Sequence, residues 1–423
     1  MRLKTDNVFM GQFDRQTSLY TIPFLNGSED PLSVSSLVDG GDGIAAILTN
    51  TLDQFLGVDL ELDESSYYRA FAPLGFGLIR TLFQYGLHEL GHSFVAYAYE
   101  GKGNLSWDTS IPGPLGIPRP IITGAYDVVL PPDLDALQAG EGFNFQGFMN
   151  QITSKRSLSS GQIQPADALD YILSGLFVFT YIVSVPDQTF DKAKVSKEDF
   201  DPTGFRRNLS NQGVQLSYAE HSFWSAFALL LNARNWDYAH ALYQYWSEGE
   251  RVEPLSLRSG GFEFYLPETQ LWHHPQGLLM EHRLTFKRKD IAYEATLDIT
   301  HPIAGESNLV RIGVEGHFDH LGSSRYSPSL EWGFYFTHKW YEEDVEGFLF
   351  QLASNIPVYA NDRFRMGISV FFQVLQNDAI ETDLKLVGDS RTKIKNYLTT
   401  GDGLEGTSNL LVTNLRTAIF FEL

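Results

Sequence analysis

The amino-acid sequence predicts an α+β fold, with a mainly helical domain over residues 1–255 and an antiparallel β-barrel-like domain over residues 256–423. Three observations predict it. Helix-like apolar segments alternate with loops in the first part of the chain, and from about residue 260 the apolar period changes to two. This alternation recurs about eight times between turn residues. The length of 423 residues also favours about two or three domains, because it exceeds one ordinary hydrophobic core.

Four segments of the first domain have the apolar pattern of helices. They are residues 43–56, 75–99, 166–185 and 216–247. Pro186 ends the third, and the fourth is expected to break near Asn232–Asn235. The Pro- and Gly-rich residues 111–133 predict an extended loop or irregular hairpin, because proline cannot continue a helix.

The second domain has strands about ten residues long, each with one apolar and one polar face. Along residues 309–318, Ile312 and Val314 share a face opposite Arg311 and Glu315. The same alternation recurs in residues 279–287, 291–300, 329–338, 345–352, 365–374, 381–387 and 411–422. Such strands are typical of a transmembrane β-barrel, and also of a soluble barrel or sandwich. Of these, we favour the membrane barrel.

The C-terminal strand adds a reason for this preference. It ends in Thr-Ala-Ile-Phe-Phe-Glu-Leu, with Leu415, Ile419, Phe421 and Leu423 on one face. This end resembles the C-terminal assembly signal of outer-membrane barrel proteins, which usually has Phe where this chain has Leu423. The resemblance implies a location in the bacterial outer membrane or in a membrane that faces the periplasm.

Composition excludes several classes of partner and site. The net charge of −21 repels phosphate backbones, so no nucleic-acid partner is expected. The chain has no cysteine, which excludes disulfides and cysteine-based zinc sites. Aromatic residues make up 14% of the chain, an enrichment that occurs in the aromatic girdles of membrane barrels and also in aromatic cores.

A metal-binding pattern, His-Glu-Leu-Gly-His, occupies residues 88–92 within the second predicted helix. His88 and His92 are one helical turn apart, so their imidazoles can converge on one Zn²⁺ ion. Glu89 lies beside the first histidine and can act as general base on a water activated by that ion. With Arg80 and Gln84, the two histidines form one polar stripe on an apolar helix, and such a stripe faces a site, not lipid.

The flank of this motif, residues 87–104, resembles the active-site helix of the site-2 protease family of membrane metalloproteases. That family takes its third zinc ligand from an Asp on a later helix, in a pattern like N-x-x-P-x-x-x-D-G. Residues 227–242 are similar in layout, with an apolar run, Asn232, a helix break and then Asp237, but they lack the Pro, and Tyr238 replaces the Gly. The resemblance covers about 35 residues in two blocks and implies that Asp237 is the third ligand.

Other third ligands remain open. Glu220 lies on a predicted helix, as in thermolysin-like zincins, and Glu141 lies in a predicted Gly-flanked loop. Asp237 itself has an ordinary alternative role as a helix cap. The remaining histidines of interest are His273, His274, His317 and His320. They match no zinc-site spacing, and we expect them to be exposed.

These features predict a membrane-associated zinc metallopeptidase that hydrolyses a protein or peptide substrate. The alternative is an outer-membrane structural or transport protein with a non-catalytic or degenerate metal site. A third possibility is an inner-membrane site-2-type protease with a soluble β domain, but the mean hydropathy of −0.16 is low for several spanning helices. The sequence identifies no partner protein.

Overall fold

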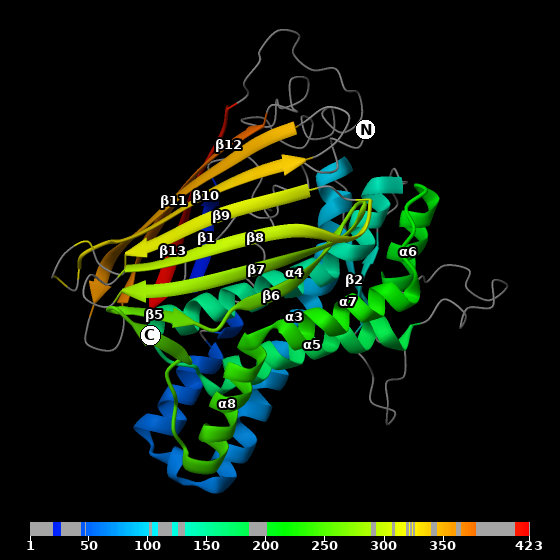
Figure 1. Cartoon of the computed structure of the whole chain (residues 1–423). Coiled ribbons are helices and arrows are strands. Elements are labelled where there is room, and N and C mark those ends of the chain that lie inside the picture. Colours follow the sequence, from blue (N-terminus) through cyan, green and yellow to red (C-terminus); the bar gives the residue numbers. More distant parts are fainter. Residues whose placement is uncertain are drawn as a thin grey trace.

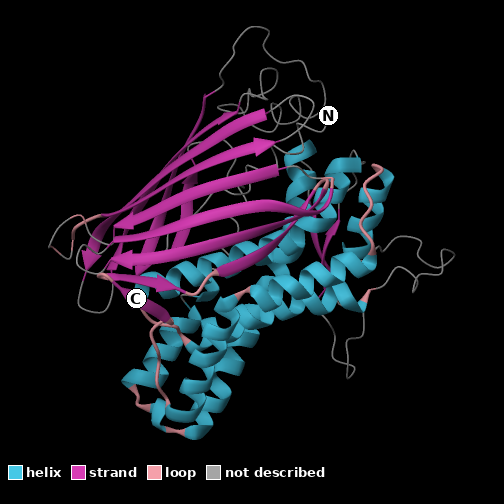
Figure 2. Ribbon diagram, in the orientation of Figure 1, coloured by secondary structure: helices cyan, strands magenta, loops and turns pink. Residues whose placement is uncertain are grey.

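A large antiparallel sheet covered on one face by helices makes up the computed structural model (Figures 1 and 2). The α+β class predicted from the sequence is therefore confirmed. The structure describes residues 20–26, 44–46, 48–100, 104–108, 121–125, 132–185, 201–288, 293–306, 309–318, 321, 324, 326–339, 345–360, 365–377 and 411–422.

Eleven strands form the sheet, and neighbouring strands are antiparallel throughout. They are β1 (Tyr20–Asn26), β4 (Ser256–Ser259), β5 (Phe262–Tyr265), β6 (Glu268–His274), β7 (Gly277–Arg288), β8 (Tyr293–Gly305), β9 (Leu309–Phe318), β10 (Ser329–Lys339), β11 (Val345–Ala360), β12 (Arg365–Asn377) and β13 (Leu411–Glu422). Strands β7 to β13 confirm seven of the predicted strands. The predicted strand at 381–387 lies outside the described residues.

The order of pairing runs β1-β13-β12-β11-β10-β9-β8-β7-β5-β4, with β6 also on β7. Strand β1 comes from the expected helical domain and pairs with β13, so the sheet crosses the boundary predicted at residue 255. No pairing among the described strands joins β1 to β4. The sheet is thus antiparallel, as predicted, and open in the part of the chain that the structure describes.

The helical part contains more helices than the sequence predicted. The elements are η1 (Gln54–Asp59), η2 (Leu62–Glu64), α3 (Ser66–Glu100), α4 (Pro132–Ser160), α5 (Pro165–Ser184), α6 (Asp201–Asn211), α7 (Tyr218–Leu231) and α8 (Ala233–Glu248), and residues 44–46 and 48–53 are also helical. The four predicted helical segments are confirmed, including the break at Asn232. Helices α4 and α6 were not predicted. Part of the predicted loop forms a ribbon, in which β3 (Ile121–Ala125) pairs with β2 (Asn104–Asp108).

Helix α4 lies between the sheet and the other helices, and it packs against α3, α6 and β6. From residue 140 to residue 158, every position except Lys155 is buried, although many of the side chains are amides or hydroxyls. A helix without an apolar stripe is seldom buried in a soluble domain. Here part of the surface that covers α4 is itself polar.

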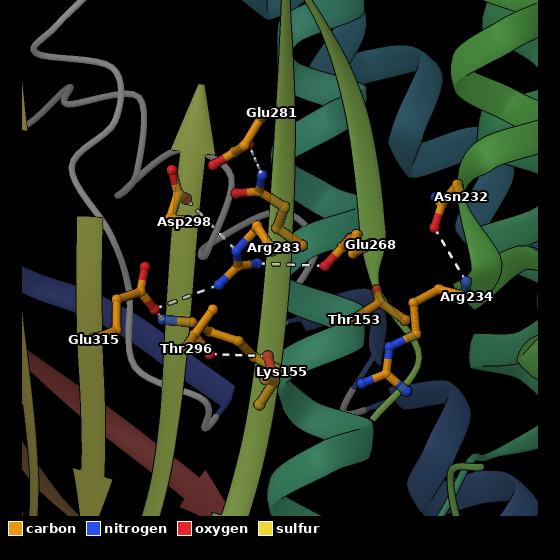
Figure 3. Close-up of polar contacts among 12 residues, drawn as sticks. Thr153, Lys155, Asn232, Arg234, Glu268, Glu281, Arg283, Thr296, Asp298 and Glu315 are labelled. Carbon is orange, nitrogen blue, oxygen red and sulfur yellow. Dashed lines mark hydrogen bonds and ion pairs between the residues drawn. The ribbon is translucent and has the colours of Figure 1, made fainter. Parts of the chain in front are cut away.

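The sheet face that meets α4 carries charged side chains (Figure 3). Lys155 of α4 lies 2.7 Å from Glu315 of β9, and Gln151 of α4 donates a hydrogen bond to Glu281 of β7. Arg283 of β7 lies 3.4 Å from Glu315 and 3.4 Å from Glu268 of β6. Charge pairing therefore holds the buried helix against the sheet.

We expect the substitution Arg283→Met to lower the free energy of unfolding by about 3–5 kcal/mol, because it leaves buried carboxylates without their cation. The side chain of Arg283 is 3% exposed. Arg258→Met is the matched control, since Arg258 is 64% exposed in its pairs with Glu253 and Glu263 and its loss should cost about 1 kcal/mol or less. Urea titration measures both. Equal small effects would show that the buried pairs do not stabilise the fold.

Apolar contacts complete the attachment of helices to the sheet. One buried cluster joins α4, α6 and α7 to β6 and β7, and it contains Ala136, Phe205, Leu209, Val214, Leu216, Ala228, Leu271, Leu278 and Met280. A second cluster joins α5 to α8 around Tyr171 and Tyr238, whose rings stack with centroids 4.2 Å apart. Within the described residues, α5 is the one helix long and apolar enough to cross a membrane, with 44% of that stretch buried.

Candidate metal centre

Helices α3 and α4 approach each other closely at His88 and His92, which are 2% and 6% exposed. A Cβ atom at Gly91 of α3 would lie 2.9 Å from the carbonyl oxygen of Glu141 on α4. A Cβ atom at Gly142 of α4 would lie 2.6 Å from Nε2 of His88 and 2.7 Å from Nε2 of His92. Glycine at position 91 therefore allows the two helices to approach, and glycine at position 142 leaves the space in which the two imidazoles lie.

Hydrogen bonds orient both imidazoles in the same sense. Nδ1 of His92 lies 2.6 Å from the backbone oxygen of Gln138, which can only accept, so this nitrogen carries the proton. Nδ1 of His88 lies 3.2 Å from the side-chain oxygen of Gln146. With Nδ1 protonated, the neutral form of each imidazole carries its lone pair on Nε2, and histidines that bind a metal are usually held in this way by their second nitrogen.

The third donor is Asp201, the first residue of α6. Its Oδ2 atom lies 3.0 Å from Nε2 of His88 and 3.3 Å from Nε2 of His92. The three donor atoms lie within 4.8 Å of one another. Two imidazole nitrogens and one carboxylate oxygen are a ligand set that suits Zn²⁺, with a fourth position left for water or substrate. The Asp201 side chain is 21% exposed, so the group is open on this side.

The charges of His92 and Asp201 stabilise each other. Burial acts to lower the pKa of His92, but the carboxylate of Asp201, with further contributions from Glu89 and Gln138, raises it to about 10. Burial acts to raise the pKa of Asp201, yet the two histidines hold it well below its usual range. A metal ion would replace the proton that the pair otherwise shares.

Glu89 and Tyr181 lie beside this group. Glu89 is half-buried, and its charge acts on His92 and on Tyr181. Tyr181 of α5 hydrogen-bonds to Asp201, and its ring centroid lies 6.4 Å from that of His88. The general base predicted from the sequence thus lies next to the candidate ligands.

Asp237, the third ligand expected from the family resemblance, is not part of this group. Its Oδ2 accepts a hydrogen bond from Arg234 at 2.8 Å, and its Oδ1 accepts one from the backbone N–H of Leu255 at 3.0 Å. Asp237 therefore ties α8 to the segment that leads into the sheet. The helix cap is Asn232, which accepts from the backbone N–H of Arg234 at 3.2 Å.

The two other carboxylates considered from the sequence also lie outside the group. Glu220 is exposed and completes a capping box with Ser217 at the start of α7. Glu141 is buried in α4, and the side chain of Asn144 donates a hydrogen bond to it at 3.2 Å. Its predicted position in a loop is wrong, because the glycines beside it do not end the helix: Gly140 faces His273 and Phe205, and Gly142 faces His88 and His92 of α3.

The polar stripe of α3, which the sequence predicted to face a site, is buried along its whole length, since Arg80 and Gln84 are 1% and 4% exposed. Arg80 donates to Asp167 of α5 and, at 2.9 Å, to Asn50. This end of the stripe is a structural contact between helices. The histidine end is the part that gathers metal-binding atoms.

The predicted exposure of His273 and His274 is wrong, because both are fully buried in β6. Nε2 of His273 lies 2.9 Å from Nε2 of His221 on α7, and a guanidinium nitrogen of Arg206 lies 3.2 Å from Nδ1 of His221. A guanidinium only donates, so Nδ1 of His221 accepts and its Nε2–H donates to His273. This chain of hydrogen bonds joins α6 and α7 to the sheet and leaves no lone pair on His221 for a metal.

His317 and His320 have different outcomes. His317 is 9% exposed on the inward face of β9, and its Nδ1 lies 3.4 Å from Glu331, so its predicted exposure is also wrong. His320 lies outside the described residues.

A cavity with several amide and hydroxyl side chains in its wall adjoins the candidate metal centre, between α4, α5, α7 and β6. Its wall includes Gln146, Asn150, Ser174, Ser225, Asn232 and Gln270. Gln146 therefore lies between the imidazole of His88 and this cavity. A polar molecule bound there would be one side chain away from the candidate ligands.

Asp201, Gln138 and Gln146 were not found from the sequence. The local signal for Asp201 is the Asp-Pro pair that opens α6, because proline suits the first turn of a helix and an acidic side chain is favoured there. No family model, curated protein or solved structure matches this chain.

Proposed function

We propose that the chain is a membrane-associated zinc metallopeptidase whose ion is held by His88, His92 and Asp201. The observation that carries the proposal is the orientation of the two imidazoles. Both Nδ1 atoms face carbonyl oxygens of α4, and both Nε2 atoms face the carboxylate of Asp201. Glu89, the next residue after the first ligand, supplies the base that a hydrolase needs.

Zn²⁺ in such a site lowers the pKa of a bound water and polarises the scissile carbonyl. Side chains of the protein transfer the protons and orient the ligands. Glu89 accepts a proton from the attacking water and can return it to the leaving amine. Gln138 and Gln146 hold the imidazoles in the tautomer that leaves Nε2 free, and Tyr181 holds the carboxylate of Asp201.

The substitution Glu89→Gln tests catalysis apart from metal binding. We expect the purified variant to keep about one zinc per chain, because Glu89 is not a ligand, and to lose peptidase activity on an unfolded protein substrate by roughly 10²–10⁴-fold. Zinc is measured by mass spectrometry and activity by the release of fluorescent peptides. The matched control is Glu220→Gln, an exposed capping residue, which should change neither quantity.

Two results would contradict the proposal. Purified wild-type protein without stoichiometric metal would remove its basis. Activity that survives Glu89→Gln in a zinc-loaded protein would show that Glu89 is not the base.

A membrane β-barrel in the bacterial outer membrane, or in a membrane facing the periplasm, is the fold that we propose with this activity. Support comes from antiparallel strands of 10 to 16 residues in β7–β13, each paired with its neighbours in the chain. Closure would require a partner for the outer edges of β1 and β4, which have none among the described strands.

One observation favours a second candidate function. The buried charges between α4 and the sheet would equally serve a structural or transport protein of the outer membrane with a non-catalytic metal site. That function predicts that Glu89→Gln leaves the cellular phenotype unchanged, whereas Arg283→Met abolishes it by disrupting the sheet.

A further inference from the structure

The sheet has a second face, turned away from α4, and large apolar side chains are exposed on it. Six of them, each 37–46% exposed, are Leu284, Leu297, Ile312, Val314, Phe334 and Phe336. The strand register places Leu284 opposite Leu297, Leu297 opposite Val314 and Val314 opposite Phe334. These residues therefore form a continuous apolar row across β7, β8, β9 and β10. We call the whole sheet face on which they lie the outward face.

Charge is distributed oppositely on the two faces. Among the described positions of the outward face on β7–β10, Arg288 at the end of β7 is the one Asp, Glu, Lys or Arg residue. On the face toward α4, Glu281, Asp298 and Arg311 are fully buried. A soluble sheet buries its apolar face and exposes its charged one. This sheet does the reverse.

The height of the outward face agrees with a bilayer. Phe336 pairs with residue 348 of β11, and Val358 lies ten residues further along the same strand and is 65% exposed. Ten residues of a strand span about 33 Å. If the strand is tilted by about 40°, as is usual in membrane barrels, this segment spans about 25 Å along the membrane normal. That length equals the height of the apolar band of such barrels.

The side chains of this row distinguish lipid from a protein partner. A protein interface carries about one hydrogen bond per 100–200 Å². The row from Leu284 to Phe334 contains aliphatic and aromatic side chains only, so it has nothing with which to orient a polar partner. Acyl chains require no hydrogen bonds.

We infer that the outward face of β7–β11 lies against the acyl chains of a bilayer, with α4 enclosed on the polar side of the sheet. The inference rests on the membrane association proposed above, and it identifies the surface of the sheet that contacts the membrane. It depends neither on zinc nor on catalysis. The charged pairs that hold α4 then lie where lipid cannot reach them.

Nitroxide labels test the inference directly, because the chain has no cysteine and each introduced one is unique. Val314→Cys and Phe334→Cys label the outward face, and Ser259→Cys, an exposed position beside exposed Arg258, is the control. The full chain is placed in vesicles of phosphatidylcholine and phosphatidylglycerol. Collision rates of each label are measured with oxygen, which concentrates in lipid, and with a nickel chelate, which stays in water.

At residues 314 and 334 we expect collisions with oxygen to exceed those with the chelate several-fold, and at residue 259 the reverse. More collisions with the chelate at 314 and 334 would mean that the face meets water and would overturn the inference. Exclusion of both reagents would overturn it too, since a second copy or another protein would then cover the face. Zinc content of the same samples separates this result from the proposed peptidase, because either can fail while the other holds.

Discussion

The substitution Asp201→Asn should lower zinc affinity by at least two orders of magnitude and abolish peptidase activity. The side chain keeps its size, but it loses the negative charge that makes it a ligand. The binding of zinc to a structural site contributes about 10–16 kcal/mol of free energy. The loss of one of three protein ligands should therefore cost several kcal/mol of binding free energy. Affinity is measured by competition with a chelating dye.

Asp237→Asn is the matched comparison, because the family resemblance predicted Asp237 as the ligand. Its carboxylate holds the guanidinium of Arg234, which is 3% exposed, at 2.8 Å. We therefore expect a loss of stability of about 3–5 kcal/mol with unchanged zinc per folded chain. If Asp237→Asn removes the metal and Asp201→Asn does not, our assignment of the third ligand is wrong.

The addition of a single methyl group at Gly142 should have the second-largest effect on zinc affinity. In Gly142→Ala the new Cβ would lie 2.6 Å from Nε2 of His88 and 2.7 Å from Nε2 of His92, too close for either ring to stay in place. We expect zinc affinity to fall roughly 10–100-fold, as it does when ligands lose their orientation. Overpacking should also cost about 1–3 kcal/mol of stability.

Gly75→Ala is the control for this substitution, because it is the same change in a helix with nothing within 4 Å of the new atom. It should stabilise the protein by about 0.5–1 kcal/mol and leave the zinc content alone. The measurements are thermal unfolding and metal analysis. Normal zinc affinity in Gly142→Ala would mean that the histidines do not bind the ion in the observed geometry.

The sheet could be predicted because its signal is local. Alternating residues such as Ile312 and Arg311 face opposite sides whatever the strand packs against. Helix α4 gave no such signal. A helix is recognised by an apolar stripe, and α4 lacks a clear one because charged side chains of the sheet and the polar stripe of α3 cover part of its surface. Its glycines suggested a loop, whereas Gly142 serves the packing against His88 and His92.

The candidate site was predictable only as far as it lies within one helix. The spacing of His88 and His92 places both on one face of α3. Asp201 lies on α6, a helix of 11 residues with polar composition, and it reaches the histidines through tertiary packing alone. The family resemblance led instead to Asp237, whose pattern fits a helix start but whose carboxylate is held by Arg234.

The pairing of β1 with β13 bears on how the chain folds. Tyr20 lies opposite Phe421, and Asn26 opposite Arg416, so strands roughly 400 residues apart in sequence are neighbours. Such a contact has a very large sequence separation and can form only after the residues of β13 have been synthesised. The pairing of β1 with β13 therefore follows the synthesis of every other described strand. A chain that stopped before β13 would leave β1 without its described partner and would turn β12 into an open edge.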